Sequence, residues 1–92
     1  MSFYEKSNYN LSTHSHYRIK ERLKLNVSDL ELRGKVNEII SKSNYSWETS
    51  KTLYIQSNIN DVYFVIDKVS NLIITATQIS HQKQIEIIEN EK

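Results

Sequence analysis

Hydrophobic positions in the first half of the chain recur every three or four residues, which is the spacing of one face of an α-helix. From residue 11 onward this face consists of Leu11, Ser15, Ile19 and Leu23. Ser12 or Thr13 stands at the start and can accept a hydrogen bond from a free backbone N–H of the first turn. The pattern therefore predicts a first helix over residues 12–25.

A second helix is indicated by the sequence Ser28-Asp29-Leu30-Glu31. In such a capping box the serine side chain bonds the glutamate N–H, and the glutamate side chain bonds back to the serine N–H. We expect this helix to span residues 29–42 and to turn Leu32, Val36, Ile39 and Ile40 inward. Gly34 inside it costs about 1 kcal/mol relative to alanine, and close packing against the first helix would explain its presence.

After residue 44 the hydrophobic period changes from 3.6 to 2, which is typical of β-strands. We expect strands at 45–48, 52–57, 62–66 and 72–77, with turns at 58–60 and 68–71. The stretch 62–66 is apolar on both faces and is predicted to be a central strand. Residues 79–92 fit either a strand or a helix.

This order predicts an α+β fold, in which two N-terminal helices pack on one face of a small antiparallel sheet. The 92 residues suffice for a single domain. We divide it into an N-terminal arm or edge strand (1–10), two helices (12–42), an antiparallel meander (45–78) and a C-terminal segment (79–92).

Composition narrows the function mainly by exclusion. The chain has no cysteine, which excludes disulfides, thiolate zinc sites and a cysteine nucleophile. No His-x-x-x-His spacing is present, so we expect no metal and no cofactor. A net charge of +1 does not demand nucleic acid. Because no apolar run resembles a signal peptide or a membrane span, we expect a cytoplasmic protein without a membrane partner.

Three side chains of the first helix carry the most suggestive chemistry. His14, Arg18 and Arg22 follow one another at i, i+4 and i+8 and share one face of a helix, at the border of the core stripe. An imidazole exchanges a proton near neutral pH, and arginine binds phosphate oxygens and stabilises transition-state charge. The same pattern also fits a solvated helix whose arginines pair with glutamates. His81 is a candidate second acid or base if the C-terminal segment returns toward this helix.

Basic and aromatic residues supply further candidate binding positions. Lys20, Lys24 and Arg33, together with Arg22, are expected to gather around the turn between the two helices. Trp47 and Tyr63 belong to an aromatic set that can stack on unpaired bases or contact a protein partner. Tyr63 also fits a plain role in the core of the sheet, and Trp47 fits the cover of its edge.

The string Ser12-x-His14-Ser15-x-x-Arg18-Ile19-x-Glu21-Arg22 resembles the first helix of small RelE-like proteins, in the barnase–EndoU–colicin–RelE group of ribonuclease folds. The segments 63–67 and 72–77 resemble the strand hairpin of that family. The resemblance implies that His14 is the acid or base and that Arg18 and Arg22 face the phosphate. One departure concerns the last strand, which commonly ends in Tyr-Arg in the family and here ends in Thr77-Gln78. Loss of that cation and phenol weakens transition-state stabilisation.

Two functions follow as hypotheses. The first is a metal-independent endoribonuclease of the toxin type, in which the ribose 2′-hydroxyl attacks the neighbouring phosphate. The alternative is a non-catalytic inhibitor or interaction protein of a phage or mobile element that binds a host protein, because fold does not fix function. The expected partner is accordingly RNA or a host or antitoxin protein, and a homodimer is a further option.

Overall fold

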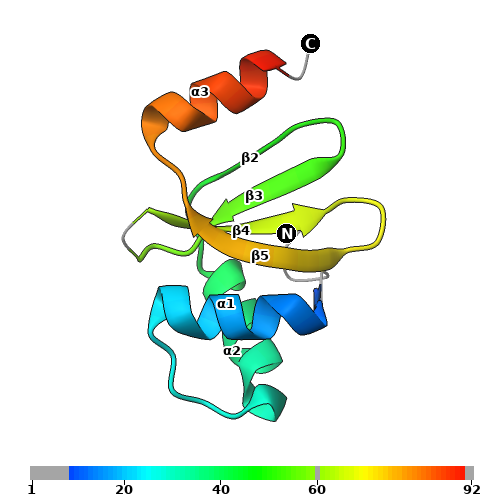
Figure 1. The fold of residues 1–92 in the computed structure, drawn as a ribbon, viewed down its shortest axis with the longest axis vertical. Helices are drawn as coiled ribbons and strands as arrows, with labels where there is room; N and C mark the ends of the chain where they lie inside the picture. The colour runs from blue at the N-terminus through cyan, green and yellow to red at the C-terminus, as the bar shows by residue number, and fades with distance from the viewer. Residues whose placement is uncertain (1–8, 60, 91–92) are drawn as a thin grey trace.

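The computed structural model describes residues 9–59 and 61–90. Its helices and strands are, in chain order, β1 (Asn10–Leu11), α1 (Thr13–Leu23), α2 (Asp29–Ser41), β2 (Ser46–Glu48), β3 (Thr52–Gln56), β4 (Val62–Asp67), β5 (Leu72–Gln78) and α3 (His81–Asn90). Figure 1 shows α1 and α2 together at one end of the molecule and α3 at the opposite end, with the sheet between them. No helix in the described ranges is long and apolar enough to span a bilayer.

The five strands form one sheet in the order β1-β5-β4-β3-β2. The predicted α+β architecture, with two N-terminal helices followed by the sheet, is confirmed. The sheet is mixed rather than purely antiparallel, because β1 runs parallel to β5, with Asn10 opposite Leu72 and Leu11 opposite Ile73. β1 lies at the edge of the sheet and shares only Asn10 with the segment 1–10, for which an arm or an edge strand was expected; residues 1–8 lie outside the described part of the chain.

Both predicted N-caps form. The Ser12 hydroxyl accepts a hydrogen bond from the Ser15 backbone N–H at 3.1 Å and begins α1. At the start of α2, the Ser28 hydroxyl accepts from the Glu31 N–H, and the Glu31 carboxylate accepts from the Ser28 N–H, which completes the capping box. Helix α1 ends at Leu23, and the following cap residue, Lys24, has a left-handed φ of 57°, which stops further helical bonding.

The hydrophobic core lies between these two helices and one face of the sheet. Each helix contributes its predicted stripe, and β4 contributes every second residue, Val62, Phe64 and Ile66, as the pleat requires. In β5 the core residues Ile73 and Ala76 are three positions apart, because the pairing with β4 shifts register between Val65 and Ile66. The fully buried side chains of the core include Ile19, Leu32, Val36, Ile40, Ile55, Phe64, Ile66 and Ile73. Ser15 is also buried and donates its hydroxyl to the Ser12 carbonyl at 2.8 Å.

The expectation that Gly34 allows close packing of α2 against α1 is wrong. This residue lies on the exposed side of α2, and a Cβ built there would meet no atom within 4 Å. Close packing against α1 therefore does not require a glycine at this position.

The ambiguous C-terminal segment forms a helix. The Ser80 hydroxyl accepts a hydrogen bond from the Lys83 N–H at 3.1 Å, and its carbonyl accepts one from Gln84 at 3.0 Å. Ile79, directly before this cap, is buried. The isoleucines of this segment fit either a strand or a helix, and the cap formed by Ser80 favours the helix.

Candidate nucleic-acid interface

Arg18, Arg22 and Lys24 line one hollow on the surface. Arg18 lies at the middle of α1, Arg22 lies in its last turn, and Lys24 is the cap residue that follows the helix. The opposite wall comes from the sheet, where β4 begins at Val62 and β5 ends at Gln78. Gln78 stands where the resembling family commonly has an arginine. It thus borders the two arginines of the predicted site.

The hollow carries an excess of positive charge. No carboxylate of residues 9–59 and 61–90 lies within 4.0 Å of the charged nitrogens of Arg18, Arg22 or Lys24, although Glu21 lines the same hollow. One side chain, Arg22, also lies in the last turn of α1, where a cation interacts favourably with the helix dipole. Three cations against one carboxylate make this a place that attracts anions.

His14 lies outside this hollow. It is exposed in the first turn of α1, does not line the hollow, and makes no hydrogen bond to any residue that the structure describes. It keeps the helical spacing to Arg18, so it stands one turn away from the first arginine. The prediction that all three side chains share one groove is therefore wrong for His14.

Tyr17 belongs to the aromatic set of the sequence, although it was not among the expected binding residues. Its side chain is 69% exposed on α1, three residues after His14 and directly before Arg18. An exposed aromatic ring beside cations is the combination with which proteins hold single-stranded nucleic acid. In the sequence, Tyr17 can be recognised as an aromatic residue that lies outside the apolar stripe of an amphipathic helix.

His81 does not return toward α1. It begins α3 and lines a different hollow, together with Tyr45, Tyr63, Gln84 and three other residues. Because the sheet separates α3 from α1 (Figure 1), His81 and His14 do not form an acid–base pair. The predicted catalytic set is thus divided between the two ends of the molecule.

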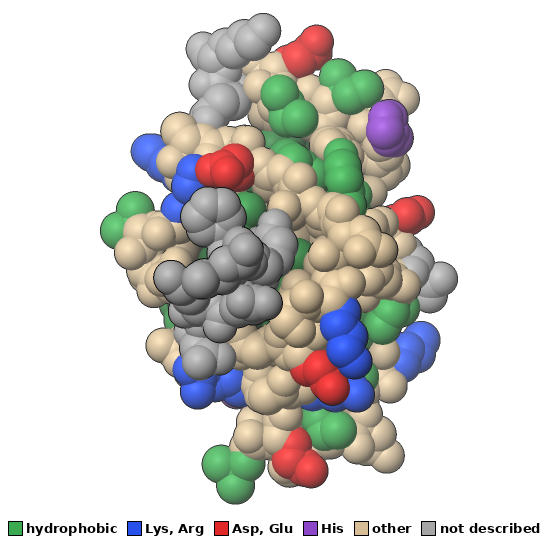
Figure 2. Space-filling view, turned by 180° about the vertical axis from the view of Figure 1, so that it is seen from behind, with side chains coloured by type: hydrophobic (Ala, Val, Ile, Leu, Met, Phe, Trp, Pro, Cys, Tyr) green, Lys and Arg blue, Asp and Glu red, His purple; other side chains and the backbone are tan. Residues whose placement is uncertain are grey.

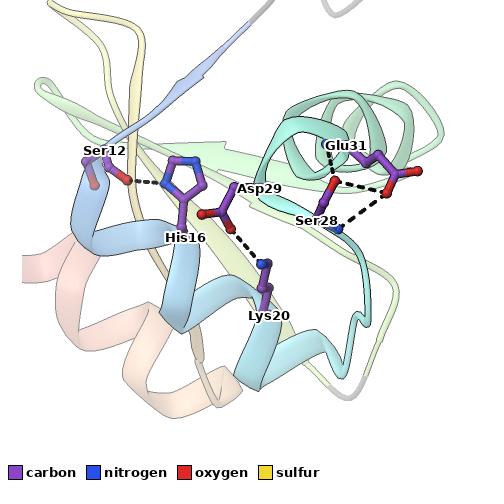
Figure 3. A network of polar contacts seen from close by, with 6 residues as sticks. All are labelled: Ser12, His16, Lys20, Ser28, Asp29 and Glu31. Atoms are coloured by element: carbon purple, nitrogen blue, oxygen red, sulfur yellow. Dashed lines mark hydrogen bonds and ion pairs between the residues drawn. The ribbon is translucent and has the colours of Figure 1, made fainter.

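The expected basic cluster at the turn between α1 and α2 is also divided. Lys20 forms an ion pair with Asp29 at 2.6 Å, and this partner lowers the pKa of the Asp29 carboxyl (Figure 3). Arg33 donates its Nε–H to the Tyr9 carbonyl at 3.3 Å. Of the predicted binding cations, Lys24 alone joins the arginines of the hollow.

His16 sits beside the Lys20–Asp29 pair, as Figure 3 shows, and is half-buried. Its Nδ1 lies 3.0 Å from the Ser12 carbonyl oxygen. Because a carbonyl only accepts, this contact selects the tautomer with the proton on Nδ1. The residue serves the local structure of α1.

Trp47 and Tyr63 lie on the sheet face that is turned away from α1 and α2. Trp47 stacks on Tyr54 with ring centroids 4.0 Å apart, and it meets Tyr63 edge-on at 6.2 Å. Tyr63 is 5% exposed, and its burial, followed by the proximity of Tyr45, raises the pKa of its phenol. Both residues therefore belong to an aromatic row that does not face the basic hollow.

The fold and these surfaces define a small α+β domain with a basic hollow at one end and an aromatic sheet face. No group of three or more His, Cys, Asp or Glu in the described ranges is placed to hold a metal ion. Comparison of the chain with protein-family models, with curated proteins and with solved structures finds no match. Membership of a RelE-like family, and a partner that is RNA or a host protein, therefore stay predictions.

Proposed function

We propose that this protein binds the phosphate backbone of single-stranded RNA along α1, with Arg18, Arg22 and Lys24 as the phosphate-facing cations. The observation that supports it is the gathering of these three side chains in one hollow without an ion-pair partner in the described chain. Unpaired cations bind phosphates without first breaking an internal pair. The planar guanidinium groups also present two N–H donors to phosphate oxygens.

Single-stranded RNA fits the neighbourhood of the hollow better than a duplex does. Exposed Tyr17 offers a ring for stacking on an unpaired base next to Arg18. The resemblance of this helix to RelE-like proteins favours RNA over other polyanions. Because no aromatic side chain lines the hollow itself, we expect recognition of the backbone with little base preference.

Cleavage of the bound RNA is a second candidate function, favoured by the position of Glu21. This carboxylate lines the hollow, and it follows His14 by seven residues on the same helix face, about 10 Å along the axis. Glu21 would accept the proton of the ribose 2′-hydroxyl, whose oxygen attacks phosphorus. His14 would donate a proton to the departing 5′-oxygen, which leaves a 2′,3′-cyclic phosphate and a free 5′-hydroxyl.

Fluorescence anisotropy of a labelled single-stranded RNA of mixed sequence tests the binding proposal at several salt concentrations. Three phosphate contacts predict that log affinity falls with log salt with a slope of about −2. In the variant Arg18→Gln/Arg22→Gln this slope falls toward about −0.7, since one contact remains. Lys51→Gln removes an exposed charge elsewhere and serves as control. Equal affinity and slope in the double variant and the control would overturn the proposal.

A separate assay in EDTA tests cleavage. Wild-type protein, His14→Ala and Glu21→Gln are incubated with end-labelled RNA, and the products are examined for cyclic phosphate ends. Cleavage that both substitutions abolish supports the assignment of acid and base. Intact RNA at high protein concentration rejects the cleavage hypothesis and leaves the binding proposal to the anisotropy experiment.

A further inference from the structure

A second hollow lies where α3 leaves the sheet. Its walls come from the segment before β2, the end of β3, the start of β4 and the first turn of α3. Six polar side chains line it: Tyr45, Gln56, Asp61, Tyr63, His81 and Gln84. Its volume of about 380 Å³ falls within the range of about 300–1,000 Å³ that small-molecule pockets occupy. The hollow is therefore large enough for a small ligand.

Hydrogen bonds between these segments hold the walls of the hollow in place. The Tyr45 carbonyl accepts a hydrogen bond from the Gln56 N–H at 3.0 Å. The Asp61 carbonyl accepts one from the Ile79 N–H at 3.1 Å. The Gln84 side-chain amide donates to the Tyr45 hydroxyl at 2.5 Å and so ties α3 to the opposite wall. The lining is thus positioned before a ligand arrives, which lowers the entropic cost of binding.

Tyr63 brings an unused hydrogen-bonding group to this hollow. The residue is 5% exposed, yet its hydroxyl makes no hydrogen bond to a residue that the structure describes. The Trp47 Nε1–H comes near this hydroxyl but is sealed from solvent without forming a hydrogen bond. Burial, followed by the proximity of Tyr45, raises the pKa of the Tyr63 phenol, so the phenol keeps its proton at neutral pH. Buried polar groups normally have a partner, and an oxygen atom bound in the hollow supplies one for the Tyr63 O–H.

The lining offers hydrogen-bond donors and acceptors side by side. The Asp61 carboxylate only accepts, whereas the Tyr63 hydroxyl is free to donate. The Tyr45 oxygen already accepts from Gln84, so its O–H proton is also available to donate. The side-chain amide of Gln56 does both. A matching ligand presents donors and acceptors close together, as the hydroxyl groups of a sugar do.

The charge of the hollow disfavours ionised ligands. Among the described residues that line it there is no Lys or Arg, so a phosphate would meet the Asp61 carboxylate without a cation to offset it. An ammonium group accepts no hydrogen bond and would leave the Tyr63 O–H without a partner. Figure 2 shows hydrophobic side chains at the α3 end of the molecule and most of the visible Lys and Arg side chains nearer the opposite end. Ile79 and the ring of Tyr45, which is 41% exposed, add apolar surface to the lining.

We infer that this hollow binds the ring of a neutral sugar. Asp61 accepts hydrogen bonds from sugar hydroxyls, and a sugar oxygen accepts one from Tyr63. The C–H face of the ring packs on Tyr45. A single sugar ring makes few contacts, so we expect a roughly millimolar dissociation constant. The described linings of this hollow and of the basic hollow share no residue, and the inference does not rest on RNA binding.

Saturation-transfer NMR with the whole chain tests the inference, because it detects weakly bound sugars from their own signals. The probes are glucose, galactose, mannose and N-acetylglucosamine, each at about 10 mM, which is roughly ten times a millimolar dissociation constant. We expect saturation transfer to at least one of them. A fluorescence titration of Trp47, the one tryptophan of the chain, measures the affinity, since its ring meets Tyr63 edge-on at 6.2 Å.

Two conservative substitutions test the assigned contacts. Asp61→Asn removes the charge and keeps a residue that tolerates the left-handed φ of 59°, and we expect at least about tenfold weaker binding because a charged acceptor is lost. Tyr63→Phe removes only the hydroxyl and should weaken binding about twofold to tenfold. Tyr17→Phe removes a hydroxyl from an exposed ring elsewhere and serves as control. Circular dichroism confirms that each variant folds.

Three results would overturn the inference. The first is the absence of saturation transfer to all four sugars. The second is wild-type affinity in both Asp61→Asn and Tyr63→Phe, because the sugar then binds elsewhere. The third comes from acetate and choline, which are included as charged probes: binding of either in place of the sugars assigns the hollow to an ionised ligand.

Discussion

The side chain of Asn37 on α2 holds the backbone that leads into β1. Its Oδ1 accepts a hydrogen bond from the Tyr9 N–H at 3.0 Å, and its Nδ2 donates to the Tyr9 carbonyl at 3.2 Å. Tyr9 is 4% exposed and belongs to the core. We predict that Asn37→Ala destabilises the protein by releasing this contact between the second helix and the edge of the sheet.

The cost follows from what each backbone group loses. The Tyr9 carbonyl keeps a second donor, because Arg33 Nε–H also reaches it at 3.3 Å. The Tyr9 N–H has no other partner among the described residues, and a polar group left unsatisfied away from water costs about 1–3 kcal/mol. Because Asn37 is only half-buried, water softens this cost, and we expect a loss of about 1–2 kcal/mol. In a domain of this size that lowers Tm by about 4–16 °C.

Urea unfolding and hydrogen exchange measure the two consequences. The free energy of unfolding of Asn37→Ala is compared with that of Asn44→Ala, which changes an exposed asparagine and is expected to stay within about 0.5 kcal/mol of the wild type. Exchange of the Asn10 amide, which bonds to the Asn71 carbonyl at 3.3 Å, should accelerate in Asn37→Ala. Unchanged stability together with unchanged exchange would refute the reasoning.

Two further predictions concern α2 and the aromatic row. Gly34→Ala is expected to raise the free energy of unfolding by about 0.5–1 kcal/mol, since the site is helical and open, and a decrease in urea unfolding would contradict this. Burial raises the pKa of the Tyr63 phenol above its ordinary 10.0, so its contribution to stability is complete below about pH 10 and disappears as the pH rises through the raised pKa. Stability of Tyr63→Phe should therefore decline less steeply above pH 10 than that of the wild type, whereas Tyr17→Phe, a change at an exposed ring, should follow the wild type.

Local signals made the helices and the central strands predictable. Ser12 and Ser28 each precede an apolar stripe of helical period, and both cap their helices as expected. The ranges of β2 to β5 agree to within two residues with those expected from the change of hydrophobic period after residue 44. In each case the information lies within one turn or one strand, where neighbouring residues decide the conformation.

The features that escaped prediction depend on contacts between distant residues. β1 has two residues, too few for a periodic pattern, and it forms because it meets β5 some 62 positions later. The Asn37 clamp joins positions 28 residues apart, and asparagine on a half-exposed helix face carries no sign of a backbone partner. The site shows the same limit, because helical spacing places Arg18 and Arg22 together but says nothing of Gln78 on the opposite wall.

The sheet separates the basic hollow from α3, and this decides how the RNA-binding experiment is interpreted. The basic hollow involves α1 and the ends of β4 and β5, whereas α3 lies at the other end of the molecule (Figure 1). Ile85→Gln/Ile88→Gln, which changes two half-exposed side chains of α3, should therefore leave the salt slope of RNA binding unchanged. A change of the slope in this variant acts through the shared core, since Ile79 before α3 and Val62 in the hollow are both buried beside β5. The unfolding curve of that variant identifies such an effect.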